Sequence, residues 1–443
     1  MRDPQAYDAA NPSGLTQMDE GLFAKITWRL IPLLVVCYVV AFIDRINISY
    51  AQLGMKQTLP FDNAAYAIGA GLFFIGYLIF EIPSNLLLER IGVRKTLLRI
   101  MCCWGAVSLA MAFVKTEAQL YILRFLLGAF EAGFYPGIVL YLTYWYPADR
   151  RGRVFAAFST AIVIAPIIAG PLSGAILKYC DGGFGLHGWQ WLFILQGMPA
   201  CLLGVMAFHV LADKPAQAGW LNEEEKQYLE HRLADPDPPV QGSRWPLIKR
   251  FLASPTVYMF ALASILFSGA SYTVIFSMPS LIESWGVKDP LMVGTYTIAP
   301  YFFAASGMIL IGGSSDRWNE RRWHFAVATC IAATGLLMAV WAQGHLVPSL
   351  AGLCIMGFGQ GALLPLYTAI ISNYVPRNVA AAGIALLSCV GHLGSASAPA
   401  IIAKITSAWG TPMVGLSAVA GLFLCAGLLI LLALHRNAAG SRR

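Results

Sequence analysis

Apolar residues dominate this chain in long runs that are separated by short polar turns. Twelve runs are long enough to cross a lipid bilayer as a helix, which takes about 20 residues. The pattern therefore predicts an all-α membrane protein with twelve transmembrane helices. The runs cover residues 28–50, 64–87, 97–115, 119–144, 154–177, 190–211, 255–281, 291–313, 324–342, 347–373, 380–404 and 412–434.

One long polar stretch, residues 212–250, divides the runs into two sets of six. We therefore expect two pseudo-symmetric six-helix bundles, over 1–211 and 251–443, joined by a cytoplasmic linker. Asn222 can cap a small helix in this stretch, because the acidic residues 223–225 that follow suit a helix N-terminus. This helix could be a functional lock or a partner site. We favour a solvated linker that lets the two bundles move.

Composition supports a membrane protein, since 58% of residues are hydrophobic and 12% are charged. Soluble proteins carry about twice that share of charge. The net charge of +7 does not indicate a nucleic-acid partner, because the basic residues lie in turns between spans. The first 25 residues lack the pattern of a secretory signal, so the first run is expected to be a retained helix. The nine cysteines show no metal-like pairing, so neither a metal nor a cofactor is expected.

The distribution of basic residues predicts the orientation in the membrane. Of 30 lysines and arginines, two lie inside spans, five fall on one side and 23 on the other. Because positive loops stay in the cytoplasm, both termini are expected there. We predict a multi-pass protein of a bacterial-type inner (plasma) membrane.

A weak internal repeat relates the two halves. Residues 85–95 and 312–322 each place an acid–arginine pair five residues before a basic pair. Two related halves are typical of secondary transporters.

Four charged residues stand at bilayer depth, where each costs roughly 3 kcal/mol or more and usually serves a function. They are Asp44, Arg45, Arg124 and Glu131. Residues seven apart return to nearly the same helix face, so Arg124 and Glu131 should share one stripe with Tyr135, whereas neighbours such as Asp44 and Arg45 point about 100° apart. A structural ion-pair network is one interpretation. We favour a site where an incoming anion competes for an arginine and thereby promotes protonation of a carboxyl group.

Several segments carry a resemblance to a known family. In the loop after the second run, Glu89, Arg90, Gly92, Arg94 and Lys95 match the motif Gly-x-x-x-Asp-Arg-x-Gly-Arg-Arg, with Asn85 in place of the first glycine. With the segments that follow, the chain resembles the major facilitator superfamily and, within it, the anion:cation symporters, which take up sugar acids, tartrate, phthalate and hydroxyphenylacetate. These segments are Phe42–Asn47, Gly76–Asn85, Leu123–Gly133 and Gly188–Trp191.

The resemblance implies roles for individual residues. Asp44 and Glu131 match proton sites, and Arg45 and Arg124 match arginines for substrate binding and coupling, with Arg124 favoured as the carboxylate clamp. Tyr77 matches a binding-site tyrosine, although it could be an ordinary buried aromatic. Further substrate-binding candidates are Gln360, Tyr367, Ser388 and His392, the last of which could equally be a packing histidine. Gating candidates are Glu89, Arg90, Arg94, Asp316 and Arg317.

Departures from sugar-acid carriers bear on the substrate. Phe42 and Val163 stand where those carriers have tyrosine and glutamine, and Leu364 and Leu366 replace hydroxyl residues. Fewer hydrogen-bonding side chains suit a carboxylate with an apolar or aromatic part.

These observations together predict a monomeric, proton-coupled secondary transporter that imports a small organic anion, aromatic or a short hydroxy acid, by alternating access. An exporter, antiporter or uniporter on the same fold remains the alternative. A membrane enzyme would need a nucleophile or metal at depth, and none is visible. A channel would repeat its charges in rings, whereas here they crowd into the first half.

Overall fold

The computed structural model describes residues 12–233, 249, 252–375 and 380–440. All regular elements within these ranges are helical. The first half contains α2 (Pro12–Thr58), α3 (Asn63–Ile91), α4 (Val93–Met111), α5 (Glu117–Glu131), α6 (Phe134–Thr143), α7 (Ala148–Ser159), α8 (Ala161–Tyr179), η1 (Gly183–Gly185) and α9 (Gly188–Val210). The polar stretch carries η2 (Pro215–Gln217) and α10 (Glu223–Leu233). The second half contains α12 (Pro255–Ser284), α13 (Pro290–Tyr296), α14 (Ile298–Trp318), α15 (Arg322–Trp341), α16 (Leu346–Tyr374), α17 (Ala380–Trp409) and α18 (Pro412–Gly440).

The expected transmembrane helices are present. Eleven segments in the described ranges are long and apolar enough to cross a membrane, with α5–α6, α7–α8 and α13–α14 each forming one span. The remaining expected span is α4, a 19-residue helix that begins with Val93, Arg94 and Lys95. It packs along α9, where a Cβ atom on Gly105 would lie 2.9 Å from the carbonyl oxygen of Gly197.

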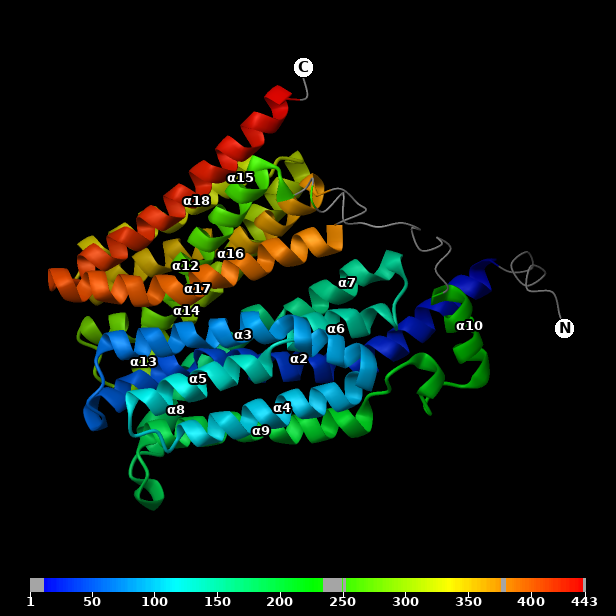
Figure 1. Cartoon of the computed structure of the whole chain (residues 1–443), viewed down its shortest axis with the longest axis horizontal. Helices are drawn as coiled ribbons and strands as arrows, with labels where there is room; N and C mark the ends of the chain where they lie inside the picture. Colours follow the sequence, from blue (N-terminus) through cyan, green and yellow to red (C-terminus); the bar gives the residue numbers. More distant parts are fainter. Residues whose placement is uncertain (1–11, 234–248, 250–251, 376–379, 441–443) are drawn as a thin grey trace.

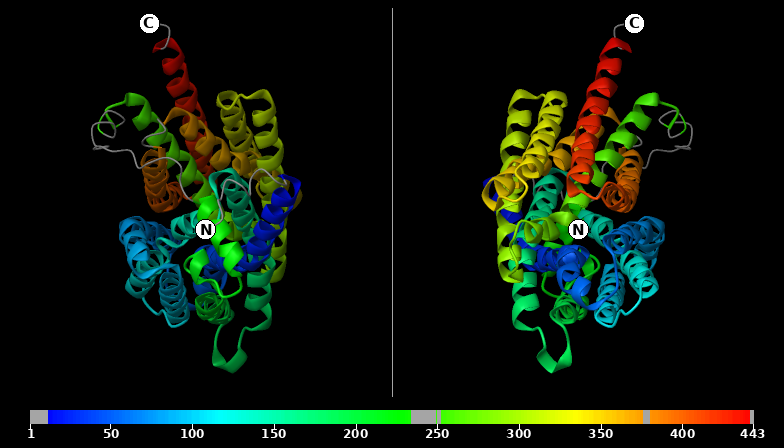
Figure 2. Two further views of the ribbon diagram at one scale, coloured as in Figure 1. Left: turned by 90° about the vertical axis from the view of Figure 1, so that its right-hand side faces the viewer. Right: turned by 90° about the vertical axis from the view of Figure 1, so that its left-hand side faces the viewer.

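The helices form two bundles, α2–α9 and α12–α18, which pack against each other (Figures 1 and 2). This arrangement confirms the predicted fold class of a two-bundle membrane protein. The exact domain limits at 211 and 251 stay predictions, and most of the stretch after Leu233 lies outside the described residues.

Close packing between α3 and α5 fixes the depth and rotation of the helix that carries Arg124 and Glu131. A Cβ atom on Gly128 would lie 1.9 Å from the carbonyl oxygen of Phe73, and one on Gly76 would lie 2.2 Å from that of Phe125. Backbone contact of this kind requires glycine, as is common between membrane helices.

The fourth predicted span is broken. Gly133 has a φ of +86°, which glycine adopts readily, and separates α5 from α6. The expectation that Tyr135 continues the stripe of Arg124 and Glu131 is therefore wrong, because Tyr135 belongs to the second helix. It packs instead against the rings of Tyr38 and Phe158.

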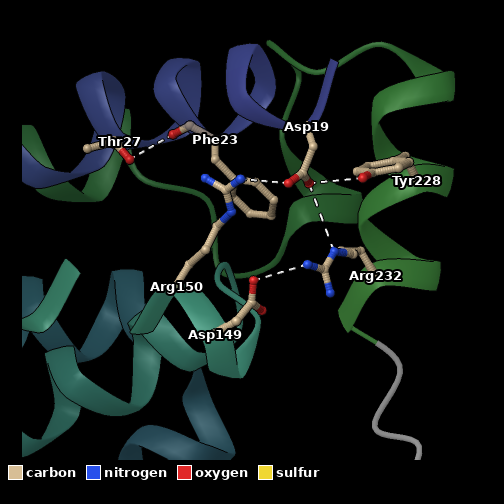
Figure 3. A network of polar contacts seen from close by, with 7 residues as sticks. All are labelled: Asp19, Phe23, Thr27, Asp149, Arg150, Tyr228 and Arg232. Atoms are coloured by element: carbon tan, nitrogen blue, oxygen red, sulfur yellow. Dashed lines mark hydrogen bonds and ion pairs between the residues drawn. The ribbon is translucent and has the colours of Figure 1, made fainter. Parts of the chain in front are cut away.

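Residues 212–233 are docked on the first bundle rather than solvated. Asp19 of α2 accepts hydrogen bonds from Arg150 of α7 (2.6 Å) and from Tyr228 of α10 (2.9 Å), as Figure 3 shows. The rings of Trp145 and Trp220 stack at 5.6 Å. The favoured interpretation of a solvated linker is thus wrong for these residues, since their aromatic and charged side chains find partners. We call this set of contacts the α10 dock.

The two ends of the molecule are distinguished by the helices that lie there. The end at which α10 lies is the α10 end. The end at which α2 finishes and α3 begins is the far end. Figure 1 shows α10 beside the beginning of α2, and α13 lies toward the far end.

Candidate functional site

Arg45 occupies the centre of the candidate site, between the two bundles. Its guanidinium group donates to the carboxylate of Glu131 in α5 and, at 3.4 Å, to the hydroxyl of Tyr272 in α12. It also lies over the rings of Phe73 and Tyr77, at 5.4 and 5.5 Å. The Arg45 side chain is 10% exposed and that of Glu131 is 1% exposed, so a ligand can reach the arginine first.

Asp44 points away from Arg45, as the expected helical rotation requires. Its Oδ1 atom accepts hydrogen bonds from Asn47 at 3.0 Å and from Ser108 of α4 at 2.9 Å. The residue is fully buried inside the first bundle. Asp44 and Glu131 therefore lie in separate polar environments, one facing α4 and the other facing the second bundle.

Arg124 is fully buried and donates hydrogen bonds to backbone carbonyl groups. Its Nε and Nη2 atoms donate at 3.4 Å to the carbonyl oxygens of Gly69 in α3 and Arg45 in α2. The structure records no hydrogen bond between Arg124 and Glu131, although both lie on α5. Arg124 thus ties three helices together behind the Arg45–Glu131 pair.

The four charged residues retain unused hydrogen-bonding capacity. Within the described part of the chain, no partner is found for one buried atom of each: Asp44 Oδ2, Arg45 Nε, Arg124 Nη1 and Glu131 Oε2. An unsatisfied buried polar group costs about 1–3 kcal/mol, which a stability role alone does not explain. Spare donors beside spare acceptors suit a site that takes up an anion and a proton in turn.

Aromatic rings from both bundles surround the Arg45–Glu131 pair on one side. Phe74 of α3 contacts Tyr272 of α12 at 4.5 Å and stacks on the ring of His392 of α17 at 5.8 Å. Tyr77 lies 5.3 Å from His392. We call Phe74, Tyr77, Tyr272 and His392 the aromatic wall. Sequence reasoning missed Phe74 and Tyr272, because aromatic residues in an apolar span carry no distinguishing signal.

The other candidates in the second half lie apart from this group. Tyr367 donates to the carbonyl oxygen of Phe260 at 2.8 Å and is 1% exposed, among the rings of Phe267 and Phe325. Gln360 is half-buried and Ser388 is exposed. The structure records no hydrogen bond from either to the aromatic wall. Of the predicted residues in the second bundle, His392 is the one for which the structure records ring contacts with Phe74 and Tyr77.

The gating candidates make their recorded contacts within their own halves. The backbone N–H of Arg94 donates to Asp213 at 2.9 Å, and its Nε atom donates to the Phe208 carbonyl at 2.8 Å. Gly92 has a φ of +85°, and a Cβ atom there would lie 2.9 Å from the Asp213 carboxylate. Asp213 is a partner that sequence reasoning missed.

The remaining gating candidates lie at the surface. Glu89, Arg90 and Arg317 are exposed, and Asp316 pairs with Arg321 at 3.1 Å. Across the described residues, no cluster of three or more histidine, cysteine, aspartate or glutamate side chains could hold a metal ion.

Comparison with known proteins places this geometry in a family. The model of the Major Facilitator Superfamily matches residues 34–399 and 260–443. The chain belongs to the major facilitator superfamily. It is a multi-pass membrane transporter and not an enzyme. In this family the two bundles move around a site between them, which is where Arg45 and the aromatic wall lie.

Two relatives and one solved structure show how far the similarity extends. The chain is 39% identical to the putative metabolite transport protein NicT of Pseudomonas putida, over 93% of this chain and 94% of that protein. It is 38% identical to a putative tartrate transporter of Agrobacterium vitis, over 94% and 92%. The structure of a bacterial homolog of the human lysosomal transporter Spinster matches the fold with a TM-score of 0.77 at 18% identity, over 91% and 96%.

Proposed function

We propose that this transporter imports an organic carboxylate together with protons and belongs to the anion:cation symporter group. The observation that carries the proposal is the buried Arg45–Glu131 pair, which lies between the bundles with unpaired atoms on both side chains. The similarity to a putative tartrate transporter supports an organic anion as the substrate.

The coupling follows from competition for one guanidinium group. A substrate carboxylate that binds Arg45 takes over hydrogen bonds that Glu131 now receives, and arginine suits this role because its planar fork binds carboxylates with two parallel bonds. Glu131, left buried without its cation, then favours the protonated form. Anion and proton thus enter together, and release of the anion returns Arg45 to Glu131.

The proposal assigns the anion contact to Arg45 rather than to Arg124. Arg124 is fully buried and donates to backbone carbonyls, whereas the Arg45 side chain is 10% exposed. Arg124 therefore positions α2 against α5. Asp44 serves in this scheme as a second proton site, within the first bundle.

The aromatic wall supports a substrate with a planar, apolar part. Tyr77 lies against the Arg45 guanidinium, and Phe74 packs on Tyr272, whose hydroxyl accepts from Arg45. Aromatic pairs contribute about 0.5–1.5 kcal/mol beyond the burial of their area. The rival substrate class is a short hydroxy acid, for which the tartrate relative argues. Uptake of galactonate without any response to aromatic acids would contradict the aromatic preference.

The orientation and location complete the proposal. The excess of basic residues at the α10 end supports a cytoplasmic location for that end and for both termini, in a bacterial-type inner membrane. The far end then faces outward. We propose that the monomer is sufficient, because the site is formed within one chain.

A thermal-shift screen of the purified protein tests the proposal. Sugar acids, tartrates and aromatic acids are each compared at two pH values, since a ligand that binds the native state raises the melting temperature. We expect aromatic carboxylates to stabilise the protein more at the lower pH, because substrate and proton bind together.

The direction of transport needs a separate measurement. Proteoliposomes with an acidic exterior should accumulate the stabilising carboxylate. Loss of internal substrate under an inward proton gradient would instead favour the exporter or antiporter on the same fold.

A further inference from the structure

The two bundles are joined by polar contacts at distinct levels along the membrane axis. In the described residues, hydrogen bonds and ion pairs link Lys178 to Asp289, Tyr50 to Thr297, Arg45 to Tyr272 and Glu81 to Cys389. The first two levels lie toward the far end, beyond the central site. They hold the two bundles together between that site and the far end.

The outermost level is an ion pair between the bundles. Lys178, near the end of α8, donates to Asp289, which precedes α13, at 2.5 Å. Asp289 also caps α13, because its Oδ1 atom accepts the N–H of Leu291 at 3.0 Å. The hydrogen bond from Lys178 holds the pKa of Asp289 below its usual range. The carboxylate therefore keeps its charge in a mildly acidic exterior.

Directly beneath this ion pair the two backbones touch. A Cβ atom on Gly174 would lie 2.4 Å from the carbonyl oxygen of Pro290, and one on Gly294 would lie 2.0 Å from that of Gly170. Tyr50 and Thr297 share a hydrogen bond of 3.1 Å at the same interface. Small side chains let α8 and α13 meet closely, but they supply little contact area of their own. The charged pair is thus the strongest attraction at this level.

A cavity of about 310 Å³ adjoins the ion pair and shows that packing there is incomplete. Residues of both bundles line it, among them Asp181, Glu283 and Lys288. Water that reaches such a cavity weakens the apolar contacts around the ion pair.

The helix that carries Lys178 is anchored at its other end. The helices α7 and α8 form one span, Ala148–Tyr179. Arg150 at the beginning of that span pairs with Asp19 in the α10 dock (Figure 3). The span therefore has one end fixed to its own bundle and the other end held to the opposite bundle.

We propose that Lys178 and Asp289 form an outer latch, which must open before the far end can admit substrate. The outer latch requires alternating access and a far end that faces outward, which are parts of the proposed function. It does not depend on the identity of the anion. Breaking it should raise the fraction of molecules that are open to the outside.

The test measures access to Thr297, which is fully buried at the latched interface. A Thr297→Cys parent is labelled from outside with a membrane-impermeant maleimide, without substrate. Modification is read on the peptide that contains residue 297 by mass spectrometry, so the native cysteines do not interfere. An exposed ion pair makes a small contribution that salt can screen, so Lys178→Gln and Asp289→Asn should each raise the labelling rate measurably, by up to about fivefold. Asparagine retains the helix cap, which isolates the charge.

A double-mutant cycle decides between a latch and general loosening. If the two side chains act as one pair, Lys178→Gln with Asp289→Asn should label no faster than either single variant. Asp19→Asn, which weakens the pairing with Arg150 at the other end of the same span, is the matched control and should leave labelling unchanged. Raising salt from low to high concentration should speed labelling of the parent but not of the double variant.

Two results with the variants, and one with the parent, would overturn the outer latch. One is an unchanged labelling rate in both single variants, and the other is full additivity in the double variant. The salt comparison on the parent applies even if a variant fails to fold, because a rate that ignores salt also contradicts the proposal. Loss of carboxylate binding in the thermal-shift screen would leave the labelling result intact, so the two proposals fail separately.

Discussion

The two bundles share a fold and a weak sequence repeat but differ in chemistry. The first bundle holds the charged residues Asp44, Arg45, Arg124 and Glu131, all of which are buried. The second presents Tyr272 and His392 to the same centre, with a hydroxyl and an imidazole in place of permanent charge. In the proposed mechanism, proton and anion chemistry therefore reside in the first half, while the second half supplies the shape of the site and the moving surface.

The variant with the largest expected effect removes the proposed proton site of the first bundle. Glu131→Gln should abolish proton-driven accumulation, because glutamine cannot gain or lose a proton. Exchange of substrate across the membrane should persist, since Arg45 remains. Proteoliposomes measure both, first under a proton gradient and then with labelled substrate against unlabelled substrate. Full accumulation by this variant would exclude Glu131 as the coupling residue.

The second test compares the two arginines. Arg45→Lys keeps the charge but loses the planar fork, so we expect uptake at low substrate concentration to fall at least tenfold, with a raised KM. Arg124→Lys is the matched control. It should lower the melting temperature through its lost backbone contacts and leave KM nearly unchanged. The opposite ranking of KM values would restore Arg124 as the carboxylate clamp.

The sequence predicted the fold and singled out the four charged residues that the structure buries, for a physical reason. Charges such as Asp44 and Glu131 stand out in an apolar span, because burial makes them costly. Which arginine pairs with which carboxylate could not be inferred from the sequence in the same way. Helical spacing placed Arg124 and Glu131 on one stripe, but it contains no information on α2, which brings Arg45 to Glu131.

The uncharged half of the site and the docked helix were harder to predict. Phe74 and Tyr272 look like any aromatic residues in a membrane span, and only tertiary contact marks them. The polar face of α10 resembles a solvated helix, since its partners Asp19 and Asp149 are more than 80 residues away along the chain.

The third test concerns the second bundle's share in selectivity. His392→Asn removes a ring that stacks on Phe74, and ring contacts of this kind contribute about 0.5–1.5 kcal/mol. We expect the preference for aromatic over hydroxy carboxylates to fall about two- to tenfold, measured by competition against uptake of one labelled acid. Proton coupling should remain intact. Tyr367→Phe is the control, because its hydroxyl group serves the core of the second bundle; it should change stability and leave the preference alone.

The smallest expected effect concerns the α10 dock, which extends the first bundle beyond its last transmembrane helix. Asp19→Asn weakens the pairing with Arg150 and Arg232 but retains a side chain that can accept from Tyr228. Because partly exposed ion pairs contribute up to about 1 kcal/mol, the melting temperature should fall by a few degrees at most and transport should continue. Hydrogen exchange should rise in residues 223–233 and stay unchanged in α15 and α16, which belong to the other bundle. Equal increases in hydrogen exchange in both bundles would show that α10 does not belong to the first bundle alone. The difference between the two halves would then be confined to the central site.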